Sequence, residues 1–399
     1  MRRFEKTHPW LRFGIDFSRV TYDLWVMLGE CQSKIEHLAG VPLRPDTARR
    51  LHSMYLAKGI RATTAIEGNT LSEKQVMDHL EGGLELPASR EYLKQEIDNI
   101  KVACNQILRE NMDGKPVQCS VERIKEFNRA VLCKLPMNEG VVPGAISDFA
   151  VTVGRYLAAP REDCDLLLER LCQWLDGADF QPRGELRLGM AIIKAIVAHL
   201  YLAWIHPFGD GNGRTARLLE FDILLSAGVP APAAHLLSNH YNLTREEYYR
   251  QLDFASRSGG DVLKFVQYAA QGLRDGLREQ IGLVREQQRD VSWRSYVHER
   301  FRSASRIENK RRRDLVLDIS MAPNPVKRSD LALLSPNCAT AYAGKSSRTL
   351  MRDLAILLEL QLIVEAPIGS QGETAETGYM ANKKLIDAFL PVRRMADRE

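Results

Sequence analysis

The stretch that decides the fold reads MAIIKAIVAHLYLAWI (residues 190–205), HPFGDGNGRTAR (206–217) and LLEFDILL (218–225). The two outer segments are apolar and predict buried helices, whereas the glycine-rich middle segment predicts a loop between them. Glycine lets backbone N–H groups come close to a ligand. The second helix begins where the loop ends, and a helix N-terminus is a ready site for an anion.

The polar side chains of this loop are chemically complementary. Arg214 and Arg217 lie three residues apart, so both project from one face of the first helical turn. Asp210 is a hard oxygen ligand of the kind that Mg²⁺ takes together with phosphate oxygens. His206 can accept a proton near neutral pH. Each residue alone has an ordinary structural explanation, but together they predict a site for a nucleotide phosphate chain, a metal ion and a general base.

At every defined position the loop resembles the Fic family signature, H-x-F-x-(D/E)-G-N-G-R-x-x-R. The resemblance implies a mostly α-helical nucleotidyltransferase, a Fic helical bundle with a small β-hairpin flap. Such an enzyme transfers AMP from ATP to a Ser, Thr or Tyr hydroxyl of a target protein or of itself. It implies that His206 is the general base, Asp210 holds Mg²⁺ and Phe208 anchors the loop. The phosphate-binding residues that it implies are Gly211, Asn212, Gly213, Arg214 and Arg217.

A second motif lies far upstream, where residues 63–69 read TTAIEGN. This stretch resembles the inhibitory motif of the same family, (S/T)-x-x-x-E-(G/N), which implies that Glu67 pairs with Arg217. A carboxylate on that arginine takes the place of the γ-phosphate and repels phosphate charge, so ATP binds in an unproductive pose. A glutamate before a helix-capping glycine is the plain alternative. Ser72 fits the N-cap of the next helix.

The flap is expected in the Gly- and Pro-rich stretch 136–160. Short β-like runs at Ile146–Val153 and Arg155–Ala158 predict a hairpin there. The resemblance implies that this hairpin clamps the backbone of the target by strand addition. The family often has an arginine shortly after a Pro-Gly pair, whereas Pro143-Gly144 is followed here by Ala-Ile-Ser, so an ordinary surface hairpin stays open.

The adenosine pocket is expected after the signature, where residues 245–252 read REEYYRQL. The resemblance implies that Tyr249 and Leu252 line this pocket, with Ser256 at a position where relatives carry Asn. An aromatic stripe at helical spacing also fits plain core.

Composition sets broader bounds. The chain has 399 residues, a length that predicts several domains, and 45% of the residues are hydrophobic and 27% charged. The net charge of +4 is small and indicates no general polyanion partner. The first residues lack the apolar region of a signal peptide. The 190–205 stretch contains Lys194 and His199, which favours a buried helix over a membrane span. The seven cysteines show no CxxC spacing and indicate free thiols. We therefore expect a cytoplasmic protein without a membrane partner.

The predicted domains are a helical region with the inhibitory helix (1–115), a Fic catalytic core (116–275), a linker helix (276–305) and a winged-helix-like domain (306–399). A long charged helix is expected from Leu277 to Arg302. The last domain is predicted to have the element order of a winged helix-turn-helix. Its elements are a short helix at Val326–Leu334, a recognition-like helix from Ser346 that ends in residues 358–364, and a β-pair around Gly369–Tyr379. Arg348 and Arg352 share a face that could meet DNA, while dimerisation and target docking fit equally well.

An autoinhibited protein adenylyltransferase is the leading interpretation. Three alternatives stay open. The protein could be a de-AMPylase in which Glu67 orients a water molecule, a transferase that uses a different donor such as UTP, or a DNA-binding regulator with a nucleotide-sensing Fic body. The intact His206 favours an enzyme, because a sensor needs no base. The target protein stays unknown, and a homodimer is compatible with the sequence.

Overall fold

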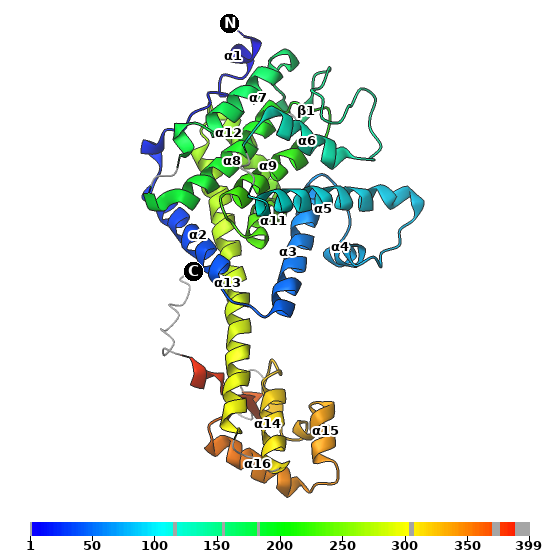
Figure 1. The fold of residues 1–399 in the computed structure, drawn as a ribbon, viewed down its shortest axis with the longest axis vertical. Helices are drawn as coiled ribbons and strands as arrows, with labels where there is room; N and C mark the ends of the chain where they lie inside the picture. The colour runs from blue at the N-terminus through cyan, green and yellow to red at the C-terminus, as the bar shows by residue number, and fades with distance from the viewer. Residues whose placement is uncertain are drawn as a thin grey trace. The chain divides into compact units, whose positions relative to one another are not determined.

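The computed structural model describes residues 2–114, 118–153, 156–181, 184–302, 307–368 and 376–387. The chain divides into two compact units, Met1–Ile281 and Gly282–Glu399. Both consist mainly of helices, which confirms the predicted mostly α fold (Figure 1). The finer domain divisions stay predictions.

The first unit is a helical bundle with one small hairpin. Its helices are α1 (Arg3–Thr7), α2 (Tyr22–Gly40), α3 (Pro45–Ile66), α4 (Glu73–Leu80), α5 (Glu91–Met112), α6 (Val121–Leu132), α7 (Arg161–Leu175), α8 (Arg187–Ile205), α9 (Asn212–Ser226), α10 (Ala231–Ala234), α11 (Leu236–Leu243), α12 (Arg245–Arg257) and the start of α13 (Leu263–Arg300).

The core of this unit is built around α8. This helix is apolar on every side, and such a helix is stable in water only when neighbours cover it all round. It packs against α9, α2 and α7. Within the described ranges, Gly184–Ile205 is the stretch long and apolar enough to cross a membrane, and 83% of its window is buried inside the protein. The prediction of a buried helix is therefore confirmed.

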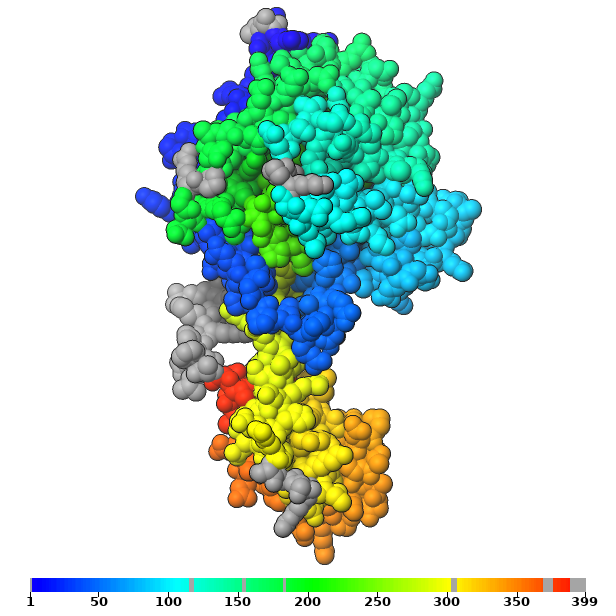
Figure 2. Space-filling model, viewed as in Figure 1, coloured from blue at the N-terminus to red at the C-terminus, as the bar shows by residue number. Residues whose placement is uncertain are grey.

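The helices α3, α4 and α5 form one continuous part of the first unit's surface (Figure 2, blue to cyan). Ser72 is the N-cap of α4, as predicted, since its hydroxyl accepts from the Gln75 N–H at 3.2 Å while the Gln75 side chain accepts from the Ser72 N–H at 3.0 Å. Helix α5 buries a set of apolar and small residues at helical spacing. They are Ile97, Ile100, Ala103, Cys104 and Ile107.

The hairpin is shorter than the sequence predicted. Strands β1 (Thr152–Val153) and β2 (Tyr156–Leu157) pair with Thr152 opposite Leu157. Ile146 instead forms an isolated bridge with Phe208. This part of the predicted strand therefore pairs with the signature loop. The predicted hairpin exists, but the prediction of its length was wrong. Arg155 lies outside the described residues.

Helix α13 begins 14 residues before the predicted start at Leu277. Asp261 accepts from the Leu263 N–H at 3.2 Å and so satisfies a donor of the first turn. The segment that follows buries a helical stripe in the first unit, which is why the helix extends back this far. The stripe comprises Phe265, Val266, Ala269, Ala270, Leu273 and Leu277.

The second unit contains α14 (Ile307–Ile319), α15 (Pro336–Tyr342) and α16 (Ser347–Glu359), with strands β3 (Val326–Lys327), β4 (Ile363–Ile368) and β5 (Glu376–Ala381). The strands form an antiparallel sheet in the order β3-β5-β4, with Val326 opposite Tyr379 and Glu365 also opposite Tyr379. Its core includes Trp293, Leu315, Leu354 and Leu357.

Three predictions for this unit were wrong in detail. Val326 and Lys327 pair with β5 instead of starting a helix, and only Leu331–Leu333 makes a 3₁₀ turn. Residues 363–364 belong to β4, because α16 ends at Glu359. The predicted β-pair begins earlier than expected, and Gly369 lies outside the described residues. The order of three helices followed by a hairpin is present, and its assignment as a winged helix stays a prediction.

Two arginines within α14 have a structural role. The buried Asp353 accepts from Arg311 Nε and from Arg312 Nε, both at 2.7 Å, and from the Tyr342 hydroxyl at 3.1 Å. These two arginines therefore hold α14 to α16. Arg348 and Arg352 are exposed on α16, and DNA binding through them stays a prediction.

Candidate active site

His206 ends α8 in a left-handed backbone conformation, with φ 50° and ψ 55°. Its ring nitrogen Nδ1 lies 3.2 Å from the Ala203 carbonyl oxygen. A carbonyl can only accept, so Nδ1 carries the proton and Nε2 keeps its lone pair. Burial lowers the pKa of His206 below its ordinary value of 6.5. The Ala203 carbonyl, Glu67 and Asp210 act to raise this pKa, but the effect of burial is larger. His206 is therefore neutral near pH 7 and able to accept a proton.

The loop is held from within by Phe208 and Asn212. The Phe208 side chain is fully buried, as the resemblance implied for the anchor. The Phe208 N–H donates to Asn212 Oδ1 at 3.0 Å, and Asn212 Nδ2 donates to the Phe208 carbonyl at 2.7 Å. The amide of Asn212 thus closes the loop on itself, and its role here is structural.

Asn128 of α6 holds the loop from outside. Its side chain is fully buried. Its Nδ2 donates to the Asp210 carbonyl at 2.9 Å, and its Oδ1 accepts from the Gly144 N–H at 2.8 Å. One side chain therefore joins the signature loop to the segment that leads into the hairpin.

Asn128→Ala is expected to lower the free energy of unfolding by roughly 1–3 kcal/mol, because it leaves buried backbone groups without partners. Urea denaturation would measure the change. Glu126→Ala, an exposed site on the same helix, is the matched control and should leave stability unchanged. Equal stability of both variants would show that Asn128 does not hold the loop.

The two signature arginines are buried at the start of α9, with 5% of Arg214 and 2% of Arg217 exposed. Arg214 donates to Glu96 Oε1 at 3.3 Å and to Asp210 Oδ1 at 3.2 Å. In the part of the chain that the structure describes, Arg214 Nε and Arg217 Nη1 are buried without an acceptor. Buried donors of a charged group without partners are costly, so this end of the site is suited to an anion.

Glu67 pairs with Arg217, as the resemblance implied. Arg217 Nη2 donates to Glu67 Oε1 at 2.6 Å, and Arg217 Nε donates to the Thr63 hydroxyl at 2.7 Å. A Cβ at Gly213 would collide with the Glu67 carboxylate, so glycine at this position is what allows the approach. Burial acts to raise the pKa of Glu67, but Arg217 outweighs it and holds that pKa below its usual range. Glu67 is thus a carboxylate near neutral pH.

The end of α3 fixes where this carboxylate lies. Gly68 has φ 104°, and the Asn69 N–H donates to the Thr64 carbonyl at 3.1 Å, which is a Schellman cap. Asn69 also donates to Glu96 Oε2 at 2.8 Å. On the other side, Arg245 Nη2 of α12 donates to the Ile66 carbonyl at 2.5 Å. A cation at a helix C-terminus is favourable, so α12 stabilises the helix end that carries Glu67.

Asp210 fits the requirements of a magnesium ligand. Its side chain is 46% exposed, and Mg²⁺ usually binds one or two carboxylates together with phosphate oxygens and water. The described ranges contain no group of three or more metal-ligating side chains.

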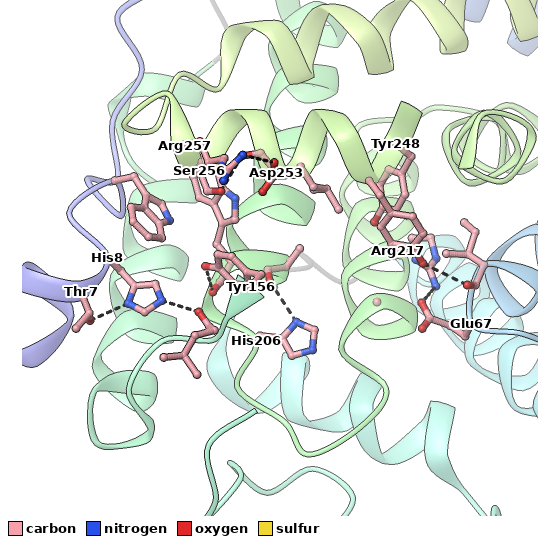
Figure 3. A pocket seen from close by; sticks show the side chains of 18 residues that line it. Thr7, His8, Glu67, Tyr156, His206, Arg217, Tyr248, Asp253, Ser256 and Arg257 are labelled. Carbon is pink, nitrogen blue, oxygen red and sulfur yellow. Dashed lines mark hydrogen bonds and ion pairs between the residues drawn. The ribbon is translucent and has the colours of Figure 1, made fainter. Parts of the chain in front are cut away.

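A cavity of about 770 Å³, within the usual range for small-molecule sites, opens beside the loop. Among the predicted residues, His206, Gly213, Arg217, Tyr249, Leu252 and Ser256 line it, together with Glu67. Figure 3 shows the Arg217–Glu67 pair on one side of His206. Asp210, Gly211, Asn212 and Arg214 are not in the lining. In this structure the Glu67 carboxylate binds Arg217, and the Glu96 carboxylate binds Arg214.

Several residues of the site had no local signal in the sequence. Asn128, Glu96 and Arg245 act through contacts with residues 82 to 179 positions away. The N-terminal residues Thr7, His8 and Trp10 also line the cavity, and no sequence motif predicted them.

The fold and the site together define a helical protein in which a loop between two core helices forms an anion site beside a neutral histidine. Residues 118–224 match the Fic/DOC family. This part of the chain is a Fic domain.

Curated relatives carry the same domain. The chain is 31% identical over 252 residues to protein adenylyltransferase fic-1 of Caenorhabditis briggsae, an alignment that covers 61% of this chain and 46% of that protein. The protein of the same name from Caenorhabditis elegans is 31% identical over 251 residues, with 61% and 46% covered. The chain thus spans about half the length of the curated relatives it matches.

Solved structures are similar in fold. A Fic family protein from Desulfovibrio desulfuricans has a TM-score of 0.55 at 19% identity, with 91% of this chain and 96% of that chain covered. This likeness concerns the fold alone. A solved part of Fic-1 from Caenorhabditis elegans has a TM-score of 0.54 at 26% identity, with 66% of this chain and 73% of that chain covered.

Proposed function

We propose that this protein is an autoinhibited protein adenylyltransferase that transfers AMP from ATP to a Ser, Thr or Tyr hydroxyl of a protein, itself included. The observation that carries the proposal is the cavity in which a neutral His206 lies beside the N-terminus of α9 and Arg217. The names of the curated relatives support the same activity.

The reaction needs a base and a way to neutralise phosphate charge. His206 Nε2 accepts the proton of the target hydroxyl, the hydroxyl oxygen forms a bond to the α-phosphorus, and the bond from that phosphorus to the β-phosphate bridging oxygen breaks. Pyrophosphate leaves, and AMP stays on the target. Bound Mg²⁺, held by Asp210, would neutralise phosphate charge. Arg214, Arg217 and the N–H groups at the start of α9 position the outer phosphates.

Autoinhibition follows from the pairing of Glu67 with Arg217. The carboxylate takes up a guanidinium that would otherwise bind the terminal phosphate, and its negative charge repels that phosphate. ATP then has no productive pose. Displacement of Glu67 is the step that activates the enzyme.

Intact-mass spectrometry tests the proposed activity. The purified Glu67→Gly variant, incubated with ATP and Mg²⁺, is expected to gain the mass of one or more AMP groups, because the site is then open and the protein itself supplies hydroxyls. UTP in place of ATP identifies the preferred donor. An unchanged mass with every nucleoside triphosphate, for a variant that is folded, would refute self-modification.

A further inference from the structure

Five charged side chains lie around the start of α9, and their contacts join them into two groups. Glu67 contacts Arg217 at 2.6 Å. Arg214 contacts Glu96 at 3.3 Å and Asp210 at 3.2 Å. The negative charges of Asp210 and Glu67 act to raise the pKa of Glu96, so the three carboxylates lie close enough to repel one another. When all five are ionised, three carboxylates face two guanidinium groups, and one negative charge is in excess.

This charge balance opposes a triphosphate even after Glu67 is removed. Arginine binds phosphate through the charge and the N–H groups of its guanidinium. Loss of Glu67 makes Arg217 available, but Arg214 still contacts two carboxylates. Asp210 has a proposed role as a ligand of Mg²⁺, whereas the proposed reaction gives Glu96 none.

Glu96 is positioned by α5 and by the capped end of α3. Its side chain is 14% exposed. Its Oε2 accepts from Asn69 Nδ2 at 2.8 Å, and the same nitrogen donates to the Leu93 carbonyl at 3.0 Å. One carboxylate oxygen is thus held by Asn69, and the other contacts Arg214. Glu67→Gly removes neither contact, so that variant keeps Glu96 beside Arg214.

The contact between Glu96 and Arg214 is one that a phosphate oxygen can replace. Charge-assisted N–H···O bonds are usually about 2.7–2.9 Å long, whereas this one measures 3.3 Å. Burial raises the pKa of Glu96 above its usual value of 4.5, although Asn69 and Arg214 act to lower it. The two partners therefore do not compensate for the burial of the carboxylate. Arg214 Nε is also buried without an acceptor among the residues that the structure describes, so the guanidinium is incompletely satisfied.

We propose that Glu96 is the counterion of Arg214 in the empty site and that it limits the affinity of this site for phosphate. The inference rests on the proposed function. An empty site needs a negative group beside Arg214, because a buried guanidinium without one is strongly destabilising. A bound triphosphate supplies that negative charge itself, and Glu96 then repels it. Glu96 therefore stabilises the empty protein and weakens phosphate binding, two effects of opposite sign.

Calorimetric titration with tripolyphosphate and Mg²⁺ at pH 8, in the Glu67→Gly background, tests this inference. Glu96→Gln keeps an oxygen that can accept from Asn69 and removes the charge. It is expected to strengthen tripolyphosphate binding roughly three- to tenfold, which is less than the full effect of a charge-assisted hydrogen bond because this bond is long. The thermal midpoint of the ligand-free variant should fall by a few degrees. A merely structural role would lower the midpoint without strengthening the binding.

Self-labelling gives a second readout in the same background. Glu96→Gln should lower the KM for ATP severalfold and leave kcat unchanged, because the proposed competition acts equally on the bound substrate and on the transition state. Should Glu96→Gln not fold, Glu96→Asp draws the charge back by one CH₂ group and should change binding in the same direction.

The matched control is Glu91→Gln. Glu91 is exposed on the same helix and pairs with Lys94 at 2.8 Å, so neither the affinity nor the KM should respond to its loss. Unchanged tripolyphosphate binding in Glu96→Gln would overturn the inference alone. Weakened binding would also overturn it and would show that Glu96 positions Arg214 for phosphate. A Glu67→Gly parent that binds no tripolyphosphate would refute the anion site of the proposed function together with the inference.

Discussion

His206→Ala is expected to reduce AMP transfer by roughly 10²- to 10⁴-fold, the usual contribution of a positioned general base. ATP affinity should be unchanged, because the phosphate-binding groups do not include the imidazole. The two quantities are measured separately, by incorporation of labelled AMP and by calorimetry, in the Glu67→Gly background. His37→Ala, an exposed histidine on α2, is the control. Undiminished labelling in His206→Ala would remove His206 from the reaction.

The same base predicts a pH dependence with a definite sign. His206 acts only when Nε2 is unprotonated, and burial lowers its pKa below 6.5. The rate of labelling should therefore be level around pH 7 and fall only as the pH drops through that lowered pKa. A rate that declines already between pH 8 and 7 would assign the titration to another group.

Glu67→Gly is expected to raise self-labelling by roughly ten- to a hundredfold. The variant removes a charge-assisted hydrogen bond to Arg217, which contributes roughly 1.5–3 kcal/mol, and each 1.4 kcal/mol corresponds to about one decade in population. Arg217→Ala should not reproduce the gain, because it also removes a phosphate ligand. The double variant should therefore be as inactive as Arg217→Ala alone.

The control for this variant is Glu85→Gly, an exposed loop position that should leave labelling at the wild-type level. Wild-type labelling in Glu67→Gly would show that residues 63–69 do not inhibit. A complete loss would instead favour a hydrolytic role, in which Glu67 orients a water molecule that removes AMP from a modified protein.

The sequence predicted the centre of the site because that information is contiguous. The twelve residues of the loop carry the proposed base, the proposed metal ligand and two arginines that are proposed to bind phosphate. The fold positions His206 and Arg217 of this segment beside one cavity. Glu67 is 150 residues from Arg217, so no spacing could pair them. Only the resemblance of residues 63–69 to a known motif connected the two.

The supporting contacts could not be predicted in this way. Asn128 is an unremarkable position in an amphipathic helix until α6 and the loop are brought together, and Arg245 is one of many charged residues in α12. The local sequence around Val326 predicts a helix, but Val326 pairs with Tyr379 and is therefore in a strand. In each case the position of the residue depends on a tertiary contact, which the local sequence pattern does not determine.

The position of Glu67 upstream of the loop also bears on how the protein is made. Ribosomes synthesise a chain from its N-terminus at about 5–20 residues per second, and early segments can fold first. Glu67 is 150 residues ahead of Arg217, so at that pace it is translated roughly 8–30 seconds earlier. Helix α3 is therefore complete before α9 exists. The carboxylate that is proposed to inhibit is therefore made before the arginine that is proposed to bind phosphate. Under this proposal, no stage of synthesis yields an active transferase that lacks the inhibitory residue.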